Sequence, residues 1–281
     1  APGLWHSVHR LGCRPLSTYP LKEKIQRMKT IVTAGKGGTG KSIAISHLLK
    51  RHILGNGFGR VLIVDADPHQ SLTRYLGVQP HTNLGELRHK YAQELRTGQG
   101  LEEKSRRDFA SQLAQEAIMP LEGGDLLVMG KNDQPGCQCV VNTLLGNALD
   151  AVAENYDLVV VDNEAGIEPI GRQNWRVDHL FLFSSPKGAE LDVAWQILER
   201  ADDVDRQIGA AYLLLNRTYT GQDLRAIYAD LQKKVSSTVV LGRLPYSEQL
   251  DREEYPDETW LAALDKAWAY VHQRMQEKVL S

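Results

Sequence analysis

A glycine-rich run near the start of the chain carries the clearest chemical signal in the sequence. Residues 35–42 read Gly-Lys-Gly-Gly-Thr-Gly-Lys-Ser and match the pattern G-x-x-x-x-G-K-S/T. Glycines let a backbone wrap closely round phosphate oxygens with its N–H groups turned inward. Lys41 would reach the β- and γ-phosphates, and the Ser42 hydroxyl is a ligand for Mg²⁺. The run predicts a nucleotide-binding loop made of Gly35, Lys36, Gly37, Gly38, Thr39, Gly40, Lys41 and Ser42.

Aspartates follow two apolar runs that read as buried strands. The first run leads into Asp65 and Asp67 and is ended by Pro68, and the second leads into Asp162. One carboxylate can hold the water shell of a metal while another orients the attacking water. The pattern therefore predicts that Asp162 and Asp65, with Ser42, lie at a Mg²⁺ site. Capping of the next helix is the alternative role for Asp65.

Two cysteines stand one residue apart at Cys137 and Cys139. Thiolates suit Zn²⁺, Ni²⁺, Cu⁺ or an iron–sulfur cluster. Two thiolates cannot fill a tetrahedral site, but a two-fold axis doubles them to four. The spacing therefore favours a metal site shared by two subunits. The alternatives are two buried structural cysteines, or a strained disulfide within the pair.

Apolar runs alternate with helical patterns from Met28 onward. The helical patterns cover 42–54, 142–154, 191–201 and 222–234. Continuous apolar runs are typical of strands buried on both faces of a parallel sheet. The alternation predicts an α/β fold, a single doubly wound domain over 28–281 with helices on both faces. About seven strands are expected, over 30–34, 60–65, 125–129, 157–162, 179–184, 211–216 and 238–242.

Three segments stand apart from this alternation. Residues 1–27 carry +4 (five basic, one acidic), which leaves −6 for the rest, and they indicate a tag or upstream leader, or else a transit peptide. Residues 84–118 read as two charged helices, either a solvated hairpin or a client-binding lid. Residues 257–280 predict an amphipathic helix that packs on the sheet rather than on a membrane surface.

Composition narrows the class of protein. The 281 residues carry a net charge of −2, which gives no support to nucleic acid as a partner. No apolar run approaches the roughly 20 residues of a membrane helix, so no membrane partner is expected. Three cysteines are too few for a disulfide scaffold.

A second lysine, Lys36, reduces the number of protein families that the glycine-rich motif fits. With Lys36, the run resembles the deviant P-loop of the MinD/ParA/nitrogenase-iron-protein superfamily, in which the first lysine reaches the partner's nucleotide. The resemblance implies an ATPase that binds ATP or ADP and forms a homodimer, with Lys36 and Lys41 catalytic. The alternative is that Lys36 is an ordinary surface lysine.

Further roles follow from the same resemblance. It implies that Asp67 orients the attacking water and that Asp65 supports it. Asn216 and Arg217 follow a predicted strand, and Pro245 follows the last one. The resemblance implies that Asn216 reads the adenine edge and that Pro245 belongs to a second base-contacting loop. An Asn after a strand is also a common turn residue.

Three runs make the resemblance closer, at 125–130, 135–139 and 162–168. They are similar to the CooC-type ATPases, which help load nickel into carbon monoxide dehydrogenase. The resemblance covers nearly everything from Met28 to Pro245. It implies Zn²⁺ or Ni²⁺ at the C-x-C pair of a dimer interface, a carbon monoxide dehydrogenase-like client and a cytoplasmic location.

Two other functions stay open. An electron donor like the nitrogenase iron protein would need a cysteine in a second loop, but the segment after Asp162 has none. A ParA- or MinD-like positioning protein would need a basic surface or a membrane-targeting helix. At Ile43 and over 170–175 the sequence differs from the residues that are usual in the family. These differences concern the client enzyme and the segment after Asp162 that would respond to the γ-phosphate, and not the nucleotide site.

Overall fold

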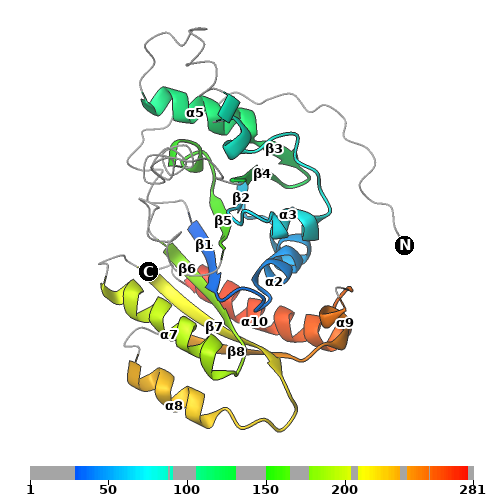
Figure 1. Ribbon diagram of the computed structural model, residues 1–281, viewed down its shortest axis with the longest axis vertical. Coiled ribbons are helices and arrows are strands. Elements are labelled where there is room, and N and C mark those ends of the chain that lie inside the picture. Colours follow the sequence, from blue (N-terminus) through cyan, green and yellow to red (C-terminus); the bar gives the residue numbers. More distant parts are fainter. Residues whose placement is uncertain are drawn as a thin grey trace.

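One mixed sheet organises the molecule, which is known from a computed structural model (Figure 1). The structure describes residues 29–87, 89–90, 106–130, 150–164, 177–203, 208–234, 239–252 and 254–277. Eight strands lie in the order β3-β4-β2-β5-β1-β6-β7-β8. They span β1 Lys29–Gly35, β2 Val61–Asp65, β3 Met119–Leu121, β4 Gly124–Val128, β5 Leu158–Asp162, β6 Val177–Ser184, β7 Ile208–Thr218 and β8 Val239–Pro245.

The inner strands of the sheet are parallel, and β2 and β5 are apolar up to the aspartate that ends each of them. All neighbours pair in parallel apart from β3 and β4, which are antiparallel. Every residue of β2 and of β5 is buried. Strands covered on both faces need such continuous apolar sequences. The predicted α/β sheet is confirmed, and the strand beyond the seven expected is the short antiparallel β3.

Helices cover both faces of the sheet. They span α2 Lys41–Leu48, η1 Leu49–Ile53, α3 Ser71–Leu76, α5 Arg106–Ala117, α7 Gly188–Asp203, α8 Arg225–Lys234, α9 Glu248–Asp251 and α10 Glu258–Glu277. One apolar cluster joins α2, η1, α3 and α10 to the sheet, and the other joins α5 and α7 to the opposite face. Successive strand residues point to opposite faces. Ile31 accordingly packs in the first cluster and Val32 in the second.

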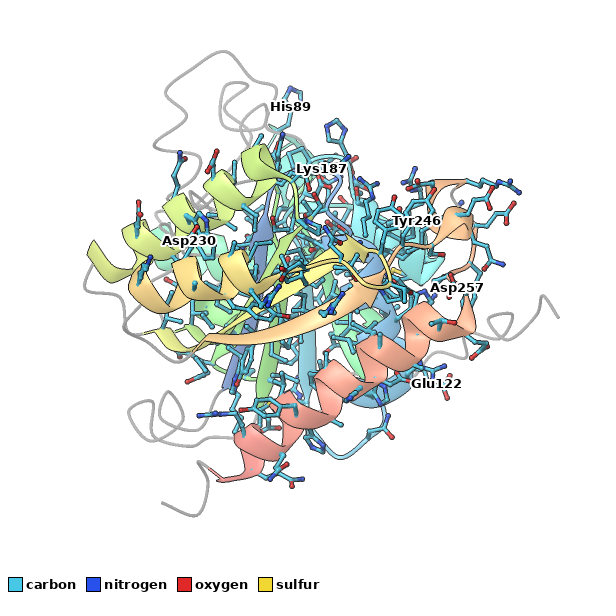
Figure 2. All side chains as sticks on the ribbon, turned by 90° about the horizontal axis from the view of Figure 1, so that it is seen from below. His89, Glu122, Lys187, Asp230, Tyr246 and Asp257 are labelled. Carbon is cyan, nitrogen blue, oxygen red and sulfur yellow. The ribbon has the colours of Figure 1, made fainter. Side chains whose placement is uncertain are left out.

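The C-terminal helix packs on the sheet, as its amphipathic pattern predicts. Figure 2 shows α10 lying against the sheet, with Asp257 at its N-terminal end. The buried residues of this helix are Trp260, Leu261, Leu264, Trp268, Val271 and Met275. In the described part of the chain, no helix is long and apolar enough to cross a membrane.

Several boundaries differ from those the sequence predicts. The first helix ends at Leu48 and continues as one π-helical segment, η1. Helix α8 begins at Arg225, three residues later than expected, where the Asp223 carboxylate accepts a hydrogen bond from the Arg225 backbone at 3.0 Å. Of the insert 84–118, the structure describes helical turns at 84–87 and 89–90 and helix α5. Residues 1–27 and most of 142–154 lie outside the described residues.

Candidate nucleotide-binding site

The glycine-rich loop joins β1 to α2, as the motif requires. Gly35 has φ +134°, and a Cβ there would lie 2.2 Å from the carbonyl oxygen of Phe183 on β6. Gly40 has φ +95°, and its Cβ would lie 2.5 Å from the side-chain nitrogen of Asn216. Only glycine meets both the backbone and the space requirements at these two positions. The loop is therefore fitted between β6 and the end of β7.

Lys41 is buried within the loop. Its Nζ donates to the carbonyl oxygens of Gly35 and Lys36, each at 3.2 Å. Burial lowers the pKa of Lys41, and the carboxylates of Asp162, Asp67 and Glu164 oppose that shift. The lysine thus lies in an acidic surrounding, with hydrogen bonds that phosphate oxygens can replace.

Asp162 lies at the end of β5 and is wholly buried. Its Oδ1 accepts a hydrogen bond of 2.6 Å from the Thr33 hydroxyl, whereas Oδ2 has no hydrogen-bond partner within the described residues. Burial raises the pKa of Asp162 to about 6, and the hydroxyls of Ser42 and Thr33 oppose the rise. A buried carboxylate oxygen without a partner needs an explanation. Together with the hydroxyl of Ser42, it fits a hard cation with oxygen ligands such as Mg²⁺.

Asp65 pairs in register with Asp162 on the neighbouring strand, but both oxygens of its carboxylate accept hydrogen bonds from other residues. Its Oδ2 accepts from the backbone N–H and the hydroxyl of Thr73, at 2.8 and 2.6 Å, and its Oδ1 accepts from the Asp67 N–H at 3.2 Å. Thr73 is the third residue of α3, so these contacts are those of a helix cap. They fit the capping alternative for Asp65, and its role at Mg²⁺ stays a prediction.

A cavity of about 560 Å³ opens at the carboxyl ends of the parallel strands. Its lining includes eight of the expected site residues, which are Gly37, Gly38, Gly40, Lys41, Ser42, Asp67, Asn216 and Arg217. It also includes residues that sequence reasoning missed, namely His69, Arg74, Tyr75, Asn163, Glu164 and Asp251. Asn163 and Glu164 lie in the run 162–168 but were given no role there, whereas the other four have no motif of their own, because they enter the site from loops and short helices. The side chain of Lys36 is exposed.

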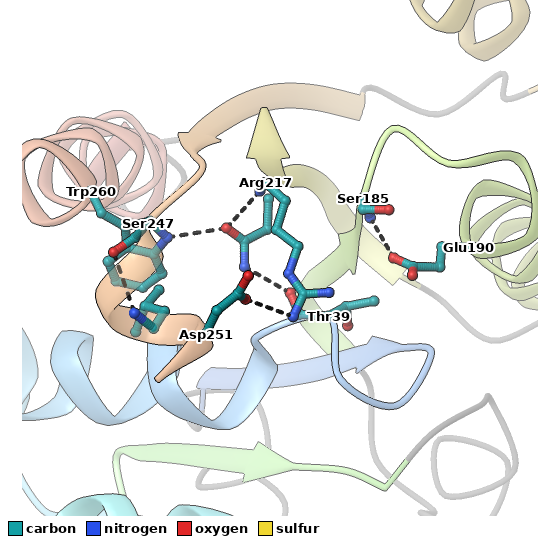
Figure 3. A network of polar contacts seen from close by, with 9 residues as sticks. Thr39, Ser185, Glu190, Arg217, Ser247, Asp251 and Trp260 are labelled. Atoms are coloured by element: carbon teal, nitrogen blue, oxygen red, sulfur yellow. Dashed lines mark hydrogen bonds and ion pairs between the residues drawn. The ribbon is translucent and has the colours of Figure 1, made fainter. Parts of the chain in front are cut away.

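Asn216 makes hydrogen bonds to Thr39, Arg217 and Trp260, three residues that Figure 3 labels. Its Nδ2 donates to the carbonyl oxygen of Thr39 at 3.1 Å. Its Oδ1 accepts from the indole Nε1 of Trp260 at 3.1 Å and from the backbone N–H of Arg217 at 2.8 Å. The amide therefore connects the phosphate-binding loop to α10. The only sequence signal for this contact is that a buried tryptophan needs an acceptor for its N–H.

Arg217 lines the cavity, whereas Pro245 does not. Arg217 has φ +58°, an uncommon backbone conformation for a non-glycine residue, and its guanidinium pairs with Asp251 at 3.4 Å. Pro245 ends β8 opposite Thr218 and is not part of the cavity lining. The next residue, Tyr246, lines a smaller adjoining cavity of about 340 Å³ together with Arg217.

The expected thiolate site is the one part of the predicted chemistry that involves cysteines. Cys137 and Cys139 fall outside the described residues. Within the ranges that the structure describes, no group of three or more His, Cys, Asp and Glu side chains is arranged to hold a metal. The interface metal stays a prediction from the sequence.

This fold and this site define a P-loop nucleotide-binding protein. Residues 30–259 match the family model described as the CobQ/CobB/MinD/ParA nucleotide binding domain, and the chain belongs to that family. The finding confirms the superfamily expected from Lys36 and Lys41. It does not distinguish the CooC-type ATPases from other members.

Two curated proteins of Methanocaldococcus jannaschii are similar in sequence, and both are described as uncharacterized ATP-binding proteins. One is 27% identical over 78% of this chain and 85% of its own length. The other is 32% identical over 50% of this chain and 60% of its own length. The relatives support nucleotide binding at the coarse level at which they are described.

Solved structures share the fold at low sequence identity. MinD from Pyrococcus horikoshii, complexed with Mg-ADP, has a TM-score of 0.56 at 18% identity and covers 87% of this chain and 96% of its own. A chain of the MinC:MinD cell division protein complex of Aquifex aeolicus has a TM-score of 0.58 at 17% identity, covering 87% of this chain and 96% of its own. A ParA family ATPase from Chlorobium tepidum has 0.54 at 18%, covering 84% and 90%.

Proposed function

We propose that the protein hydrolyses ATP with Mg²⁺ at the cavity beside the glycine-rich loop. The supporting observation is the arrangement of three neighbouring strands, β2, β5 and β1, whose carboxyl ends bring the loop lysine and the aspartates together. Open α/β sheets bind ligands at this edge. Lys41 lies among the carboxylates of Asp162, Asp67 and Glu164. The site therefore offers a positive charge for the phosphates and negative charges for Mg²⁺ and the attacking water, as phosphoryl transfer requires.

The residues of the chain divide the work of hydrolysis. Lys41 exchanges the carbonyl oxygens of Gly35 and Lys36 for phosphate oxygens when nucleotide binds. Asp67 lies half-buried in the cavity lining and orients the attacking water. Ser42 and the free Oδ2 of Asp162 would hold Mg²⁺, which neutralises phosphate charge when bound. The loop amides then position the phosphates for in-line attack.

The affinity for Mg-ATP tests the proposed site before any rate of hydrolysis is measured. Calorimetric titration with Mg-ATP should give one site per chain in the wild type. Lys41→Ala should weaken that affinity by at least tenfold, because a buried charge-assisted contact to phosphate is removed. Lys233→Ala, which removes an exposed lysine of α8 outside this cavity and the adjoining one, is the matched control and should bind as the wild type does. Equal affinity of wild type and Lys41→Ala would contradict the proposed site.

A homodimer that closes on ATP is part of the proposal. The exposed side chain of Lys36 supports it, since a residue that reaches a partner's nucleotide has to leave its own loop. Light scattering with Mg-ATP should show a dimer of about twice 31.4 kDa, and Lys36→Ala should reduce it. A monomer at all protein concentrations, with nucleotide bound, would contradict this part.

We further propose a metal-delivery role, on the CooC-like runs in the sequence. Cys137 and Cys139 of two subunits would form a four-thiolate site for Zn²⁺ or Ni²⁺, and a carbon monoxide dehydrogenase-type enzyme would receive nickel. Metal analysis tests it directly. Replacing both cysteines by serine should abolish stoichiometric metal binding and leave ATP binding intact, whereas Cys13→Ser should change neither. Unchanged metal content in the double variant would contradict the role.

A further inference from the structure

We infer that the protein has a second ligand site, an apolar cavity between α10 and the sheet that binds a free fatty acid. The cavity has a volume of about 480 Å³, and none of its lining residues lines the nucleotide cavity. The ligand has one saturated chain, which enters the cavity, and one carboxylate, which stays at the polar groups beside it. This inference is independent of the proposed function, because it concerns a different cavity.

The walls of this cavity are mostly apolar. Strands β6 and β7 form one side and α10 forms the other, and the buried apolar side chains of the lining include Phe181, Phe183, Leu214, Trp268 and Val271. Small-molecule sites commonly have a volume of this size and a lining of aliphatic and aromatic side chains. Water finds few hydrogen-bond partners in such a space, so an apolar chain is the favoured occupant.

Small residues keep the space open where α10 approaches β8, the last strand of the sheet. A Cβ built on Gly242 would lie 3.4 Å from the Cβ of Ala267, so the helix and the strand come close at that point. Ala263, one helical turn earlier, also lines the cavity and is half-buried. A larger side chain at Ala263 would occupy part of the volume that we assign to the ligand.

Polar groups gather at one part of the cavity. The hydroxyl of Tyr212 lies 3.3 Å from Nδ1 of His179, and Arg274 donates to the hydroxyl of Tyr270 at 3.0 Å. Burial raises the pKa of Tyr212, the charge of Arg274 opposes that rise and Tyr270 adds to it, so these three side chains lie near one another. Tyr212, Tyr270 and the exposed Lys266 belong to the lining. The cavity therefore combines an apolar body with a cationic and hydroxyl-bearing part.

These polar groups favour an anionic head group. The lining includes basic residues but, among the described residues, no acidic one. The acidic neighbour of Lys266 in α10, Asp265, pairs with Arg51 at 2.6 Å instead. The hydroxyl of Tyr270 accepts from Arg274, so its own hydrogen can be donated to a carboxylate, as can those of Lys266.

The burial of α10 favours a single molecule over a membrane surface. A helix that lies on a membrane exposes its apolar face to the lipid. The apolar face of α10, which includes Leu264, Trp268 and Val271, is buried against the sheet. The apolar surface that remains for a ligand lies within the cavity, where one chain can enter.

Calorimetric titration with octanoate, decanoate and dodecanoate, each below its micelle-forming concentration, tests the inference. Decanoate should bind at one site per chain. Each step of two methylenes should tighten binding roughly tenfold until the cavity is filled, because each buried CH₂ adds a similar increment. Decyltrimethylammonium, which has the same chain and a cationic head, should bind at least fivefold more weakly than decanoate.

Two neighbouring alanines of α10 supply the matched variants. Ala263→Leu fills part of the cavity and should weaken decanoate binding at least tenfold. Ala262→Leu adds the same side chain at an exposed position outside the lining and should bind as the wild type does. Lys266→Gln removes an exposed cation and should weaken binding roughly threefold. The affinity for Mg-ATP should stay unchanged in all three variants.

Several results would overturn the inference. They are no binding of decanoate or dodecanoate, equal affinities for decanoate and decyltrimethylammonium, or equal affinities of the wild type and Ala263→Leu for decanoate. Sedimentation with phosphatidylglycerol vesicles that decanoate does not reverse would assign the surface to a membrane, and would overturn it too. If Ala263→Leu does not fold, the chain-length series and the head-group comparison decide. Mg-ATP binding is measured separately, so failure of this inference leaves the proposed function standing.

Discussion

The hydroxyl of Thr33 donates a hydrogen bond of 2.6 Å to Oδ1 of Asp162, across the two central strands of the sheet. The same hydroxyl accepts from the backbone N–H of Asn163 at 3.1 Å. Thr33 therefore orients the carboxylate and fixes the start of the segment that follows it. The Oδ2 without a partner among the described residues belongs to a carboxylate whose pKa is raised to about 6 by burial. A cation at this place would relieve the cost of that burial.

The buried carboxylate predicts a specific pH dependence of stability in the absence of nucleotide and metal. The folded-state pKa of Asp162, about 6, lies above the ordinary aspartate value of 3.8. The folded protein therefore holds a proton that the unfolded chain has lost, and the free energy of unfolding falls as pH rises from about 4 to 6. The contribution is roughly 2–3 kcal/mol. Chemical denaturation across this range should show the fall in the wild type.

Asp162→Asn supplies the matched control for that measurement. The amide keeps an oxygen that accepts from Thr33 but does not titrate. The variant should lose this part of the slope between pH 4 and 6. Parallel curves for the two proteins would contradict the assignment of a raised pKa to Asp162.

The cap on α3 predicts a loss of stability at Thr73. Thr73→Val keeps the shape of the side chain but removes the hydroxyl that donates to Asp65 at 2.6 Å. Because both groups are buried, the free energy of unfolding should fall by about 1–3 kcal/mol. Thr73→Ser retains the hydroxyl and should lose less. If valine were tolerated without loss, the hydrogen bond from Thr73 would not stabilise the loop after β2.

The close approach of Asn216 to the phosphate-binding loop predicts unequal effects of two glycine substitutions. Gly40→Ala places a Cβ at φ +95° and 2.5 Å from the Asn216 side chain, so it should lower the free energy of unfolding by roughly 1–3 kcal/mol. Gly37→Ala places a Cβ where no atom lies within 4 Å, and it should be nearly neutral. Thermal unfolding of the two variants compares them. Equal melting temperatures would contradict the fitted position of the loop.

The sequence allowed the parallel sheet and the phosphate-binding loop to be predicted, because both are recorded in neighbouring residues. An apolar run such as 158–161 shows that a strand is covered on both faces, and the glycines show where the backbone turns. The end of β5 follows from Asp162, since a carboxylate interrupts the apolar run. These features need no knowledge of distant partners.

The partners of Asn216 could not be predicted in this way. Thr39 lies 177 residues before it and Trp260 lies 44 residues after it, so no local pattern records either contact. The resemblance implied a base-reading amide, whereas the structure shows that its oxygen accepts hydrogen bonds from Trp260 and Arg217. The same limit applies to Asp65, whose cap depends on Thr73 eight residues later. Side-chain hydrogen bonds across segments are set by packing, which spacing along the chain does not record.

Phosphate release from ATP by Asp67→Asn tests the central claim most directly. The claim is that this cavity hydrolyses ATP and that the Asp67 carboxylate orients the attacking water while Lys41 and the loop bind the phosphates. The account predicts that Asp67→Asn binds Mg-ATP within about threefold of the wild-type affinity and releases phosphate at least a hundredfold more slowly. Wild-type turnover by Asp67→Asn, or no turnover by the wild type with bound Mg-ATP, would contradict it.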